Sequence, residues 1–230
     1  MEKPAPVYIT KSLLWRYFRA YYPRVGGREF LQTPESLANL APIIEYFARD
    51  PGFFSRERLV RSVNGQQLRP SFNKGLLIIG GYGNGKTSIM TVLELVFSTL
   101  RMPMRFSSYK AREVVSRYEQ IWADPTFRET SRYEFYQRFS RAAGLYLDDV
   151  KKERAAYHYG KVEVIREILE MRYEAPHLKT YITCNYRESD SKQNLRDGLE
   201  EFGEKYGGHI YDRLFEMFNI IEFKGPSLRG

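Results

Sequence analysis

Cysteine is almost absent from the 230-residue chain, in which Cys184 is the single copy. One thiol cannot form an internal disulfide or a CxxC pair of zinc ligands, so a disulfide-stapled secreted fold and a zinc ribbon are both excluded. Long apolar runs are also missing: Leu76–Ile79 is short beside the roughly 20 apolar residues that a membrane helix needs. Residues 1–4 do not open a signal peptide. We therefore expect a cytoplasmic protein with no membrane partner.

Acidic residues are scarcer than basic residues in this chain. The chain has 36 Lys and Arg against 28 Asp and Glu, a formal net charge of +8. The excess is regional, because residues 1–72 hold 11 basic and 6 acidic side chains and residues 101–143 hold 9 and 5. Hydrophobic residues make up 43% of the chain, which is enough to bury a full core. The charge predicts a polyanionic partner or substrate.

A cluster of Asn, Gly, Gln and Pro at residues 64–71 predicts a linker. Before it, residues 11–22 and 34–49 have helical spacing, and Thr33 is a plausible N-cap ahead of a proline. We therefore expect a small helical N-terminal extension over residues 1–72, with a possible role in binding a partner. Residues 73–230 are expected to form the main domain.

After the linker, short apolar stretches alternate with longer stretches of helical spacing. Strands are expected at residues 75–79, 104–107, 145–148, 180–184 and 220–223. Helices are expected at residues 87–100, 111–122, 162–173 and 210–218. This βαβ alternation predicts an α/β fold in which a mainly parallel, five-stranded sheet carries helices on both faces.

The segment Gly80–Thr87 reads Gly-Gly-Tyr-Gly-Asn-Gly-Lys-Thr and fits the phosphate-loop pattern G-x-x-x-x-G-K-[ST] between a predicted strand and a predicted helix. In such a loop the glycines turn backbone N–H groups toward phosphates, and the helix N-terminus adds positive potential. Lys86 is expected to contact the β and γ phosphates, and Thr87 to offer its hydroxyl to Mg²⁺. A dinucleotide fingerprint fits poorly, because Lys86 stands where glycine is needed. The candidate nucleotide-binding residues are Gly80, Gly81, Tyr82, Gly83, Asn84, Gly85, Lys86, Thr87 and Ser88.

The stretch Leu145–Asp149 is an apolar strand that ends in two carboxylates. Asp148 is the candidate for the metal side, and Asp149 is the candidate base that orients a water. A solvated acidic turn is the alternative. Because one strand and one helix separate the loop from these acids along the chain, we expect the acidic strand to lie directly beside the loop strand. That order, and the absence of the guanine-reading Asn-Lys-x-Asp motif, favours an ATPase over a GTPase.

With these residues in hand, the sequence from about Phe72 to Arg229 resembles an AAA+ ATPase of the DnaC/IstB type, the bacterial helicase loaders and the helper ATPases of DNA transposition. The resemblance implies that Asn185 is the sensor amide near the γ-phosphate. It also implies that Arg213 is an arginine finger that reaches a neighbouring subunit. Without it, Arg213 would be read as an exposed surface residue. The branch lacks a full C-terminal lid, and Arg229 is a candidate sensor contact.

The resemblance further implies a Mg²⁺-dependent ATPase that uses ATP and assembles into a homo-oligomer with ATP. Its leading role would be a replicative helicase loader in DNA replication, with the helicase as protein partner. The nearest alternative is a transposition helper that binds target DNA and recruits a transposase. From a different class, the protein would be a nucleotide-gated binding switch with negligible turnover.

Aromatic and basic side chains interleave in residues 101–143, as in Tyr109-Lys110 and Arg117-Tyr118. Such mixtures suit single-stranded DNA, because cations follow the phosphates while rings stack on bases. The alternative is that the aromatics are core residues and the charges form a solvated face. The segment 16–22 in the extension offers a second basic and aromatic stretch for DNA or a protein partner.

Overall fold

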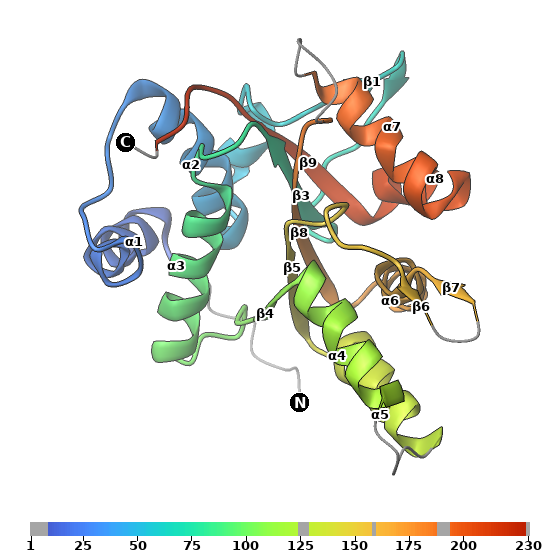
Figure 1. The fold of residues 1–230 in the computed structure, drawn as a ribbon. Coiled ribbons are helices and arrows are strands. Elements are labelled where there is room, and N and C mark those ends of the chain that lie inside the picture. Colours follow the sequence, from blue (N-terminus) through green and yellow to red (C-terminus); the bar gives the residue numbers. More distant parts are fainter. Residues whose placement is uncertain (1–8, 124–128, 158–159, 188–193, 229–230) are drawn as a thin grey trace, which may run out of the picture.

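The computed structural model describes residues 9–123, 129–157, 160–187 and 194–228. Its centre is a sheet of five parallel strands, as expected from the alternation (Figure 1). The strands are β3 (Gly75–Gly80), β4 (Ser107–Lys110), β5 (Gly144–Asp148), β8 (Lys179–Asn185) and β9 (Phe218–Phe223). The α/β fold with helices on both faces is confirmed.

The strand order β4-β5-β8-β3-β9 corrects one expectation. The acidic strand β5 does not lie beside the loop strand β3, because β8 lies between them and pairs Leu77 and Leu147 on either side of Ile182. Every residue of β3 and β5 is buried, and β8 is buried except at its first residue. Apolar composition therefore could not rank these strands from centre to edge. All three still end at the same edge of the sheet, because they run parallel.

One face of the sheet is covered by α1 (Lys11–Gly26), α2 (Pro34–Ala48), the short 3₁₀ helix η1 (Pro51–Ser55) and α3 (Lys86–Thr99). Thr33 caps α2 as expected, since its side chain accepts a hydrogen bond from the backbone of Ser36. Phe47 of α2 lies 4.9 Å from Phe97 of α3 and 5.3 Å from Tyr181 of β8, measured between ring centroids. The N-terminal helices thus share one apolar core with the sheet. A boundary at residue 72 stays a prediction.

The expected linker at residues 64–71 contains part of a short hairpin, β1 (Ser62–Val63) and β2 (Gln66–Gln67), which pair antiparallel. Asn64 and Gly65 form its turn with φ of 50° and 80°. Both values lie in the left-handed region that Asn and Gly tolerate best, so the Asn-Gly pair indicates a hairpin turn.

The other face is covered by α4 (Ala111–Ala123), α5 (Glu129–Ser140), α6 (Val164–Tyr173), α7 (Leu195–Tyr206) and α8 (Gly208–Met217), with the hairpin β6 (Ala156–Tyr157) and β7 (Lys161–Val162) at its margin. Two of these helices, α5 and α7, were not predicted. The strand expected at residues 104–107 begins only at Ser107. After β9, residues 224–228 form no helix, and no described helix is long and apolar enough to cross a membrane.

Candidate nucleotide site

The phosphate loop joins β3 to α3, as its pattern predicts. Gly83 and Gly85 have φ of 74° and 94°, so the loop turns where only glycine is unstrained. The α3 helix begins at Lys86, whose ammonium group donates to the carbonyls of Gly80 at 2.9 Å and Gly81 at 2.6 Å. The amide oxygen of Asn84 accepts a third hydrogen bond from it at 3.1 Å. The Lys86 ammonium group is therefore held by the phosphate loop itself.

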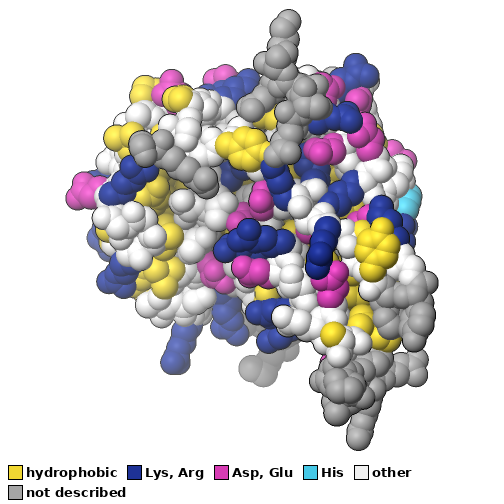
Figure 2. All heavy atoms as spheres, in the orientation of Figure 1, with side chains coloured by type: hydrophobic (Ala, Val, Ile, Leu, Met, Phe, Trp, Pro, Cys, Tyr) yellow, Lys and Arg dark blue, Asp and Glu magenta, His cyan; other side chains and the backbone are white. Residues whose placement is uncertain are grey.

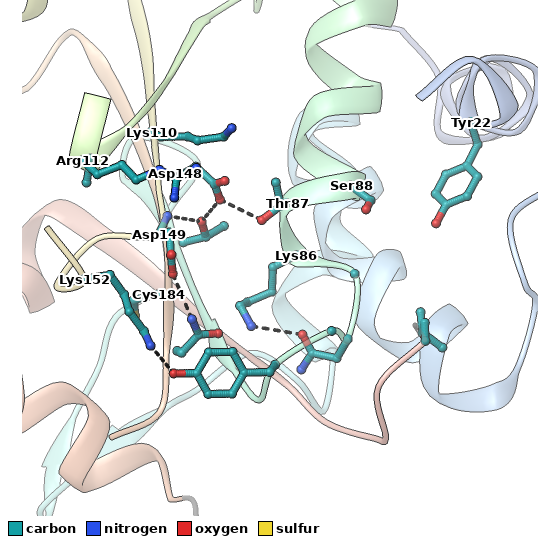
Figure 3. A pocket seen from close by; sticks show the side chains of 18 of the residues that line it. Tyr22, Lys86, Thr87, Ser88, Lys110, Arg112, Asp148, Asp149, Lys152 and Cys184 are labelled. Atoms are coloured by element: carbon teal, nitrogen blue, oxygen red, sulfur yellow. Dashed lines mark hydrogen bonds between the residues drawn. The ribbon is translucent and has the colours of Figure 1, made fainter. Parts of the chain in front are cut away.

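A cavity of about 420 Å³ opens beside this loop (Figure 3). The predicted loop residues that line it are Tyr82, Gly83, Asn84, Gly85, Lys86, Thr87 and Ser88. The remaining two, Gly80 and Gly81, act through their carbonyls. At its far side the cavity meets Asp148, Asp149 and Asn185, the predicted acidic pair and sensor amide. The phosphate loop, the acidic pair and the sensor amide, which are separate in the sequence, therefore line one cavity.

Asp148 is held by three hydroxyl groups. Its Oδ1 atom accepts hydrogen bonds from Thr87 at 2.9 Å, Tyr146 at 2.7 Å and Thr183 at 2.6 Å. Burial raises the pKa of Tyr146 well above its usual value, and the carboxylate of Asp148 adds to this, so the phenol stays a donor. Tyr146 and Thr183 were not predicted. Each stands two residues before a predicted site residue, on the same face of its strand.

The oxygen atoms of Thr87 and Asp148 suit a Mg²⁺ ion. Their separation of 2.9 Å is close to that of neighbouring ligands around an octahedral ion with bonds of about 2.0–2.1 Å. Across the described ranges, no three His, Cys, Asp or Glu side chains are grouped as a metal site. A cation here would therefore need phosphate and water ligands, which is how Mg²⁺ is bound beside nucleotides.

Asp149 and Asn185 are in direct contact. The Asn185 side-chain amide donates to a carboxylate oxygen of Asp149 at 2.9 Å. The backbone of Asp149 is in the left-handed region with φ of 58°, and Val150 donates to the carbonyl of Thr183 at 2.9 Å. This turn places the Asp149 carboxylate against the side chain of Asn185 at the end of β8.

Cations from other segments complete the cavity wall: Arg28, Lys110, Arg112 and Lys152. Lys152 donates to the phenol of Tyr82 and lies 4.6 Å from the ring centroid, which joins the phosphate loop to the turn after β5. Together with Lys86, these cations outnumber the two aspartates, so the hollow favours a polyanion. Arg28 and Tyr22 come from the N-terminal extension. Tyr22 belongs to the stretch at residues 16–22 that was predicted to contact DNA or a protein partner, and Arg28 was not predicted.

Cys184 also lines the cavity, on the β8 side. Burial raises the pKa of its thiol to about 11, although the nearby Lys151 and Lys86 oppose this. The thiol is therefore neutral at physiological pH, and a nucleophilic role is disfavoured. Its side chain is fully buried in β8.

Two predicted residues lie elsewhere. Arg213 is on α8 and is not among the cavity residues, and its guanidinium lies 4.4 Å from the ring centroid of Tyr173. A role toward a neighbouring subunit stays a prediction. Arg229 lies outside the described residues.

The region 101–143 divides into core and surface. Tyr118, Phe135, Tyr136 and Phe139 are buried against the sheet, so these rings cannot stack on bases. Tyr133 is 57% exposed. Lys110 and Arg112 line the nucleotide cavity, so their charge belongs to that site as well. On the face drawn in Figure 2, Lys and Arg side chains alternate with Asp and Glu.

The fold as a whole is similar to that of a solved structure. The chain aligns with the crystal structure of the DnaC helicase loader at a TM-score of 0.58 and 20% sequence identity, over 91% of this chain and 99% of that one. This chain has the DnaC loader fold. The family resemblance is thereby confirmed at the level of the fold.

Two further structures align more loosely. DnaA from Aquifex aeolicus bound to AMPPCP aligns at a TM-score of 0.49 and 15% identity, over 85% of this chain and 48% of that one. A primosome component from Streptococcus pyogenes serotype M3 aligns at 0.48 and 18%, over 70% and 74%. No protein-family model matches the sequence, and no curated protein does.

Proposed function

We propose that the protein binds ATP in this cavity and hydrolyses it with Mg²⁺. The observation that carries the proposal is the meeting of Lys86, Thr87, Asp148, Asp149 and Asn185 around one hollow, although they come from three segments of the chain. Five cations on the wall outnumber its two aspartates, so the cavity is positive as a triphosphate requires. The chain's own groups are thus arranged for phosphate binding at one side and for water activation at the other.

Each residue has a distinct task in this proposal. Lys86 leaves the loop carbonyls to bind the β and γ phosphates, and the N-terminus of α3 supports the same charge. Thr87 and Asp148 hold Mg²⁺, which when bound neutralises charge on the phosphate oxygens. Asp149 accepts a proton from the attacking water, while the Asn185 amide fixes the carboxylate and the water.

Phosphate release by the purified chain tests this proposal. We expect turnover in Mg²⁺, none in EDTA, and none in Lys86→Ala, because that variant loses the cation that binds ground-state phosphates. ATP binding without turnover in the wild type would favour the nucleotide-gated switch instead. If Lys86→Ala releases phosphate at the wild-type rate, this cavity is not the site of hydrolysis.

We propose a replicative helicase loader as the biological role. Support comes from the DnaC helicase loader fold, which spans nearly the whole of both chains. The test is loading of a purified replicative helicase from the same source onto circular single-stranded DNA, with and without ATP. ATP-dependent loading is the expected result. Stimulation of a transposase from the same source, with no effect on the helicase, would favour the transposition helper.

The active unit in this proposal is an oligomer whose ATP sites lie between subunits. Arg213 is the trans-acting residue, since it sits on α8 away from its own cavity. Mixing Lys86→Ala with Arg213→Ala should restore part of the activity, because mixed interfaces pair an intact loop with an intact finger. Arg196→Ala on α7, 67% exposed, is the control and should keep full activity alone. No recovery in confirmed assemblies would contradict the trans role.

Single-stranded DNA is the proposed nucleic-acid partner, with the exposed side of α5 as its contact. Arg132 and Arg138 are exposed there on either side of Tyr133. Replacing both arginines with alanine should flatten the slope of log affinity against log salt by about 1.4, at about 0.7 per phosphate contact. Tyr133→Ala should weaken binding without changing that slope. An unchanged slope in the folded double variant would exclude this surface.

A further inference from the structure

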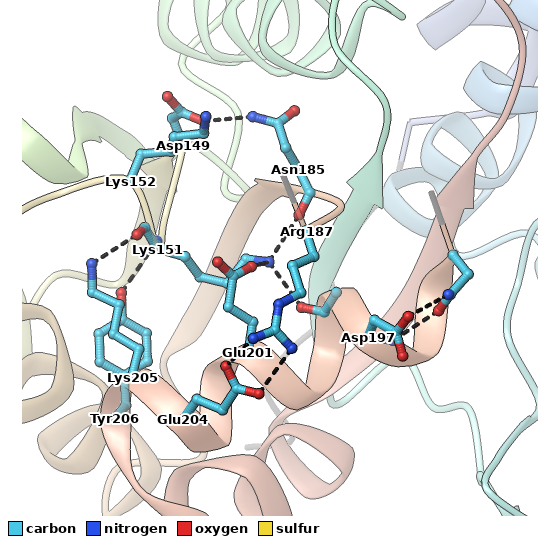
Figure 4. Close-up of polar contacts among 12 residues, drawn as sticks. Asp149, Lys151, Lys152, Asn185, Arg187, Asp197, Glu201, Glu204, Lys205 and Tyr206 are labelled. Carbon is cyan, nitrogen blue, oxygen red and sulfur yellow. Dashed lines mark hydrogen bonds and ion pairs between the residues drawn. The ribbon is translucent and has the colours of Figure 1, made fainter. Parts of the chain in front are cut away.

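Lys151 is a buried cation next to the two residues proposed for water activation. Its side chain is 3% exposed, and its ammonium group donates three hydrogen bonds. The acceptors are the carbonyl of Asn185 at 2.9 Å, the carbonyl of Gly198 at 2.8 Å and the carboxylate of Glu201 at 2.5 Å. An ammonium group has three N–H donors, so each of them has a partner (Figure 4).

These acceptors belong to two different elements. Asn185 ends β8, whereas Gly198 and Glu201 lie in α7. Lys151 itself follows β5, two residues after Asp149. One ammonium group therefore joins the ends of both catalytic strands to a single helix, as the converging sticks in Figure 4 show.

The backbone around Lys151 is strained, and hydrogen bonds hold both its N–H and its carbonyl group. Asp149 and Lys151 have φ of 58° and 81°, although neither is glycine. Such conformations cost about 1–3 kcal/mol each and persist only where the surroundings impose them. The Tyr206 phenol accepts from the Lys151 backbone N–H at 3.2 Å, and the Lys205 ammonium donates to its carbonyl at 2.7 Å. Both partners are on α7, the helix that the Lys151 side chain also contacts.

We propose that Lys151 is a positioning residue for ATP hydrolysis, which fixes Asn185 against Asp149 and couples both to α7. This inference rests on the proposed ATPase function. The Lys151 ammonium holds the Asn185 backbone, and the Asn185 side-chain amide holds Asp149. Loss of the ammonium would let the amide and the carboxylate drift apart without changing the phosphate loop. Among the described residues, Lys151 has its hydrogen bonds outside the phosphate loop Gly80–Thr87, so ATP binding should be unaffected.

Two variants and one matched control test the proposal. Lys151→Met removes the ammonium and keeps the aliphatic stem, while Lys151→Gln keeps a donor. Lys179→Met is the control, because Lys179 is a half-buried lysine at the opposite end of β8 that donates to the backbone carbonyls of Phe72 and Asn73. A merely structural role of Lys151 would lower thermal stability with no selective effect on hydrolysis.

We expect Lys151→Met to lower kcat roughly 10-fold to 100-fold with the ATP dissociation constant within about twofold of wild type. Lys151→Gln should be intermediate, and Lys179→Met should keep the wild-type kcat. Equal kcat in folded Lys151→Met and wild type would overturn the proposal. So would a parallel loss of kcat in Lys179→Met.

The side-chain amide signals of Asn185 in an ¹⁵N NMR spectrum, assigned by their loss in Asn185→Asp, give a readout that does not need turnover. We expect Lys151→Met to shift or broaden this pair and Lys179→Met to leave it in place. Unchanged signals in Lys151→Met would overturn the positioning role even if the wild type hydrolyses ATP. A wild type without turnover, but with the signals shifted in Lys151→Met, would instead reject the proposed ATPase function alone.

Discussion

The two sides of the cavity are built in different ways. The phosphate side is one continuous segment, Gly80–Ser88, whose lysine is held by carbonyls of the same loop. The water side combines Asp148 at the end of β5 and Asp149 just after it with Thr183 and Asn185 from β8, and hydroxyl and amide hydrogen bonds join them. In the proposed function, the phosphate contacts thus come from one local motif, whereas the alignment of a water depends on how the strands and α7 pack.

The difference predicts that damage to the phosphate side weakens ATP binding, while damage to the water side leaves binding intact and lowers turnover. Among the variants that keep Lys86, Gly83→Ala should weaken ATP binding most. A Cβ atom at Gly83 would lie 2.1 Å from the Ser227 hydroxyl, and φ is 74°. We expect ATP affinity to fall about 10-fold to 100-fold by calorimetric titration, because the loop N–H groups must shift.

Ser227→Gly provides the control for that variant. It removes the clashing hydroxyl, so the double variant should recover part of the affinity, while the backbone strain at position 83 remains. If Gly83→Ala binds ATP normally, the described loop conformation is not the one that binds phosphates.

On the water side, Thr183→Val should lower turnover by roughly 10-fold to 100-fold with little change in ATP affinity. The Thr183 hydroxyl donates to Asp148 at 2.6 Å and accepts from the Asp149 backbone at 3.2 Å, and valine keeps its shape without either bond. Steady-state phosphate release beside a binding titration measures both quantities. Equal losses of ATP affinity and of turnover in Thr183→Val would contradict the separate roles of the two sides.

The smallest expected effect concerns the N-terminal extension. This part of the chain, which contains α1 and α2, contributes Tyr22 and Arg28 to the cavity wall. Glu45 on α2 accepts from Lys11 at 3.0 Å and from Arg56 at 2.6 Å. Burial raises the pKa of Glu45, but these hydrogen bonds outweigh burial, and the net shift is downward from 4.5. Its carboxylate therefore stabilises the fold above about pH 4.5, and the contribution is lost as the pH falls through the lowered pKa.

Glu45→Gln should thus lower the free energy of unfolding by about 1 kcal/mol at pH 7, because Lys11 and Arg56 are each nearly half exposed. The difference from wild type should shrink below pH 4.5 in urea titrations. A difference that is the same at pH 7 and at pH 3 would assign the effect to packing instead of charge.

The sequence predicted features that are local and missed those that require folding. The loop and the strand ends carry contiguous patterns, and the spacing located all five strands to within a few residues. The strand order was wrong because β3, β5 and β8 are equally buried. The α5 helix was missed because its buried rings are interleaved with charged residues. Arg28 reaches the cavity from more than 50 residues before the loop, which no local pattern records.

The most direct test of the division is Asp149→Asn, measured by ATP titration and by single-turnover hydrolysis in Mg²⁺. Asparagine keeps the shape of the side chain but cannot accept a proton at neutral pH. The account predicts an ATP dissociation constant within about twofold of wild type and a hydrolysis rate at least about 100-fold lower. Hydrolysis at the wild-type rate by Asp149→Asn would contradict the assignment of the water side.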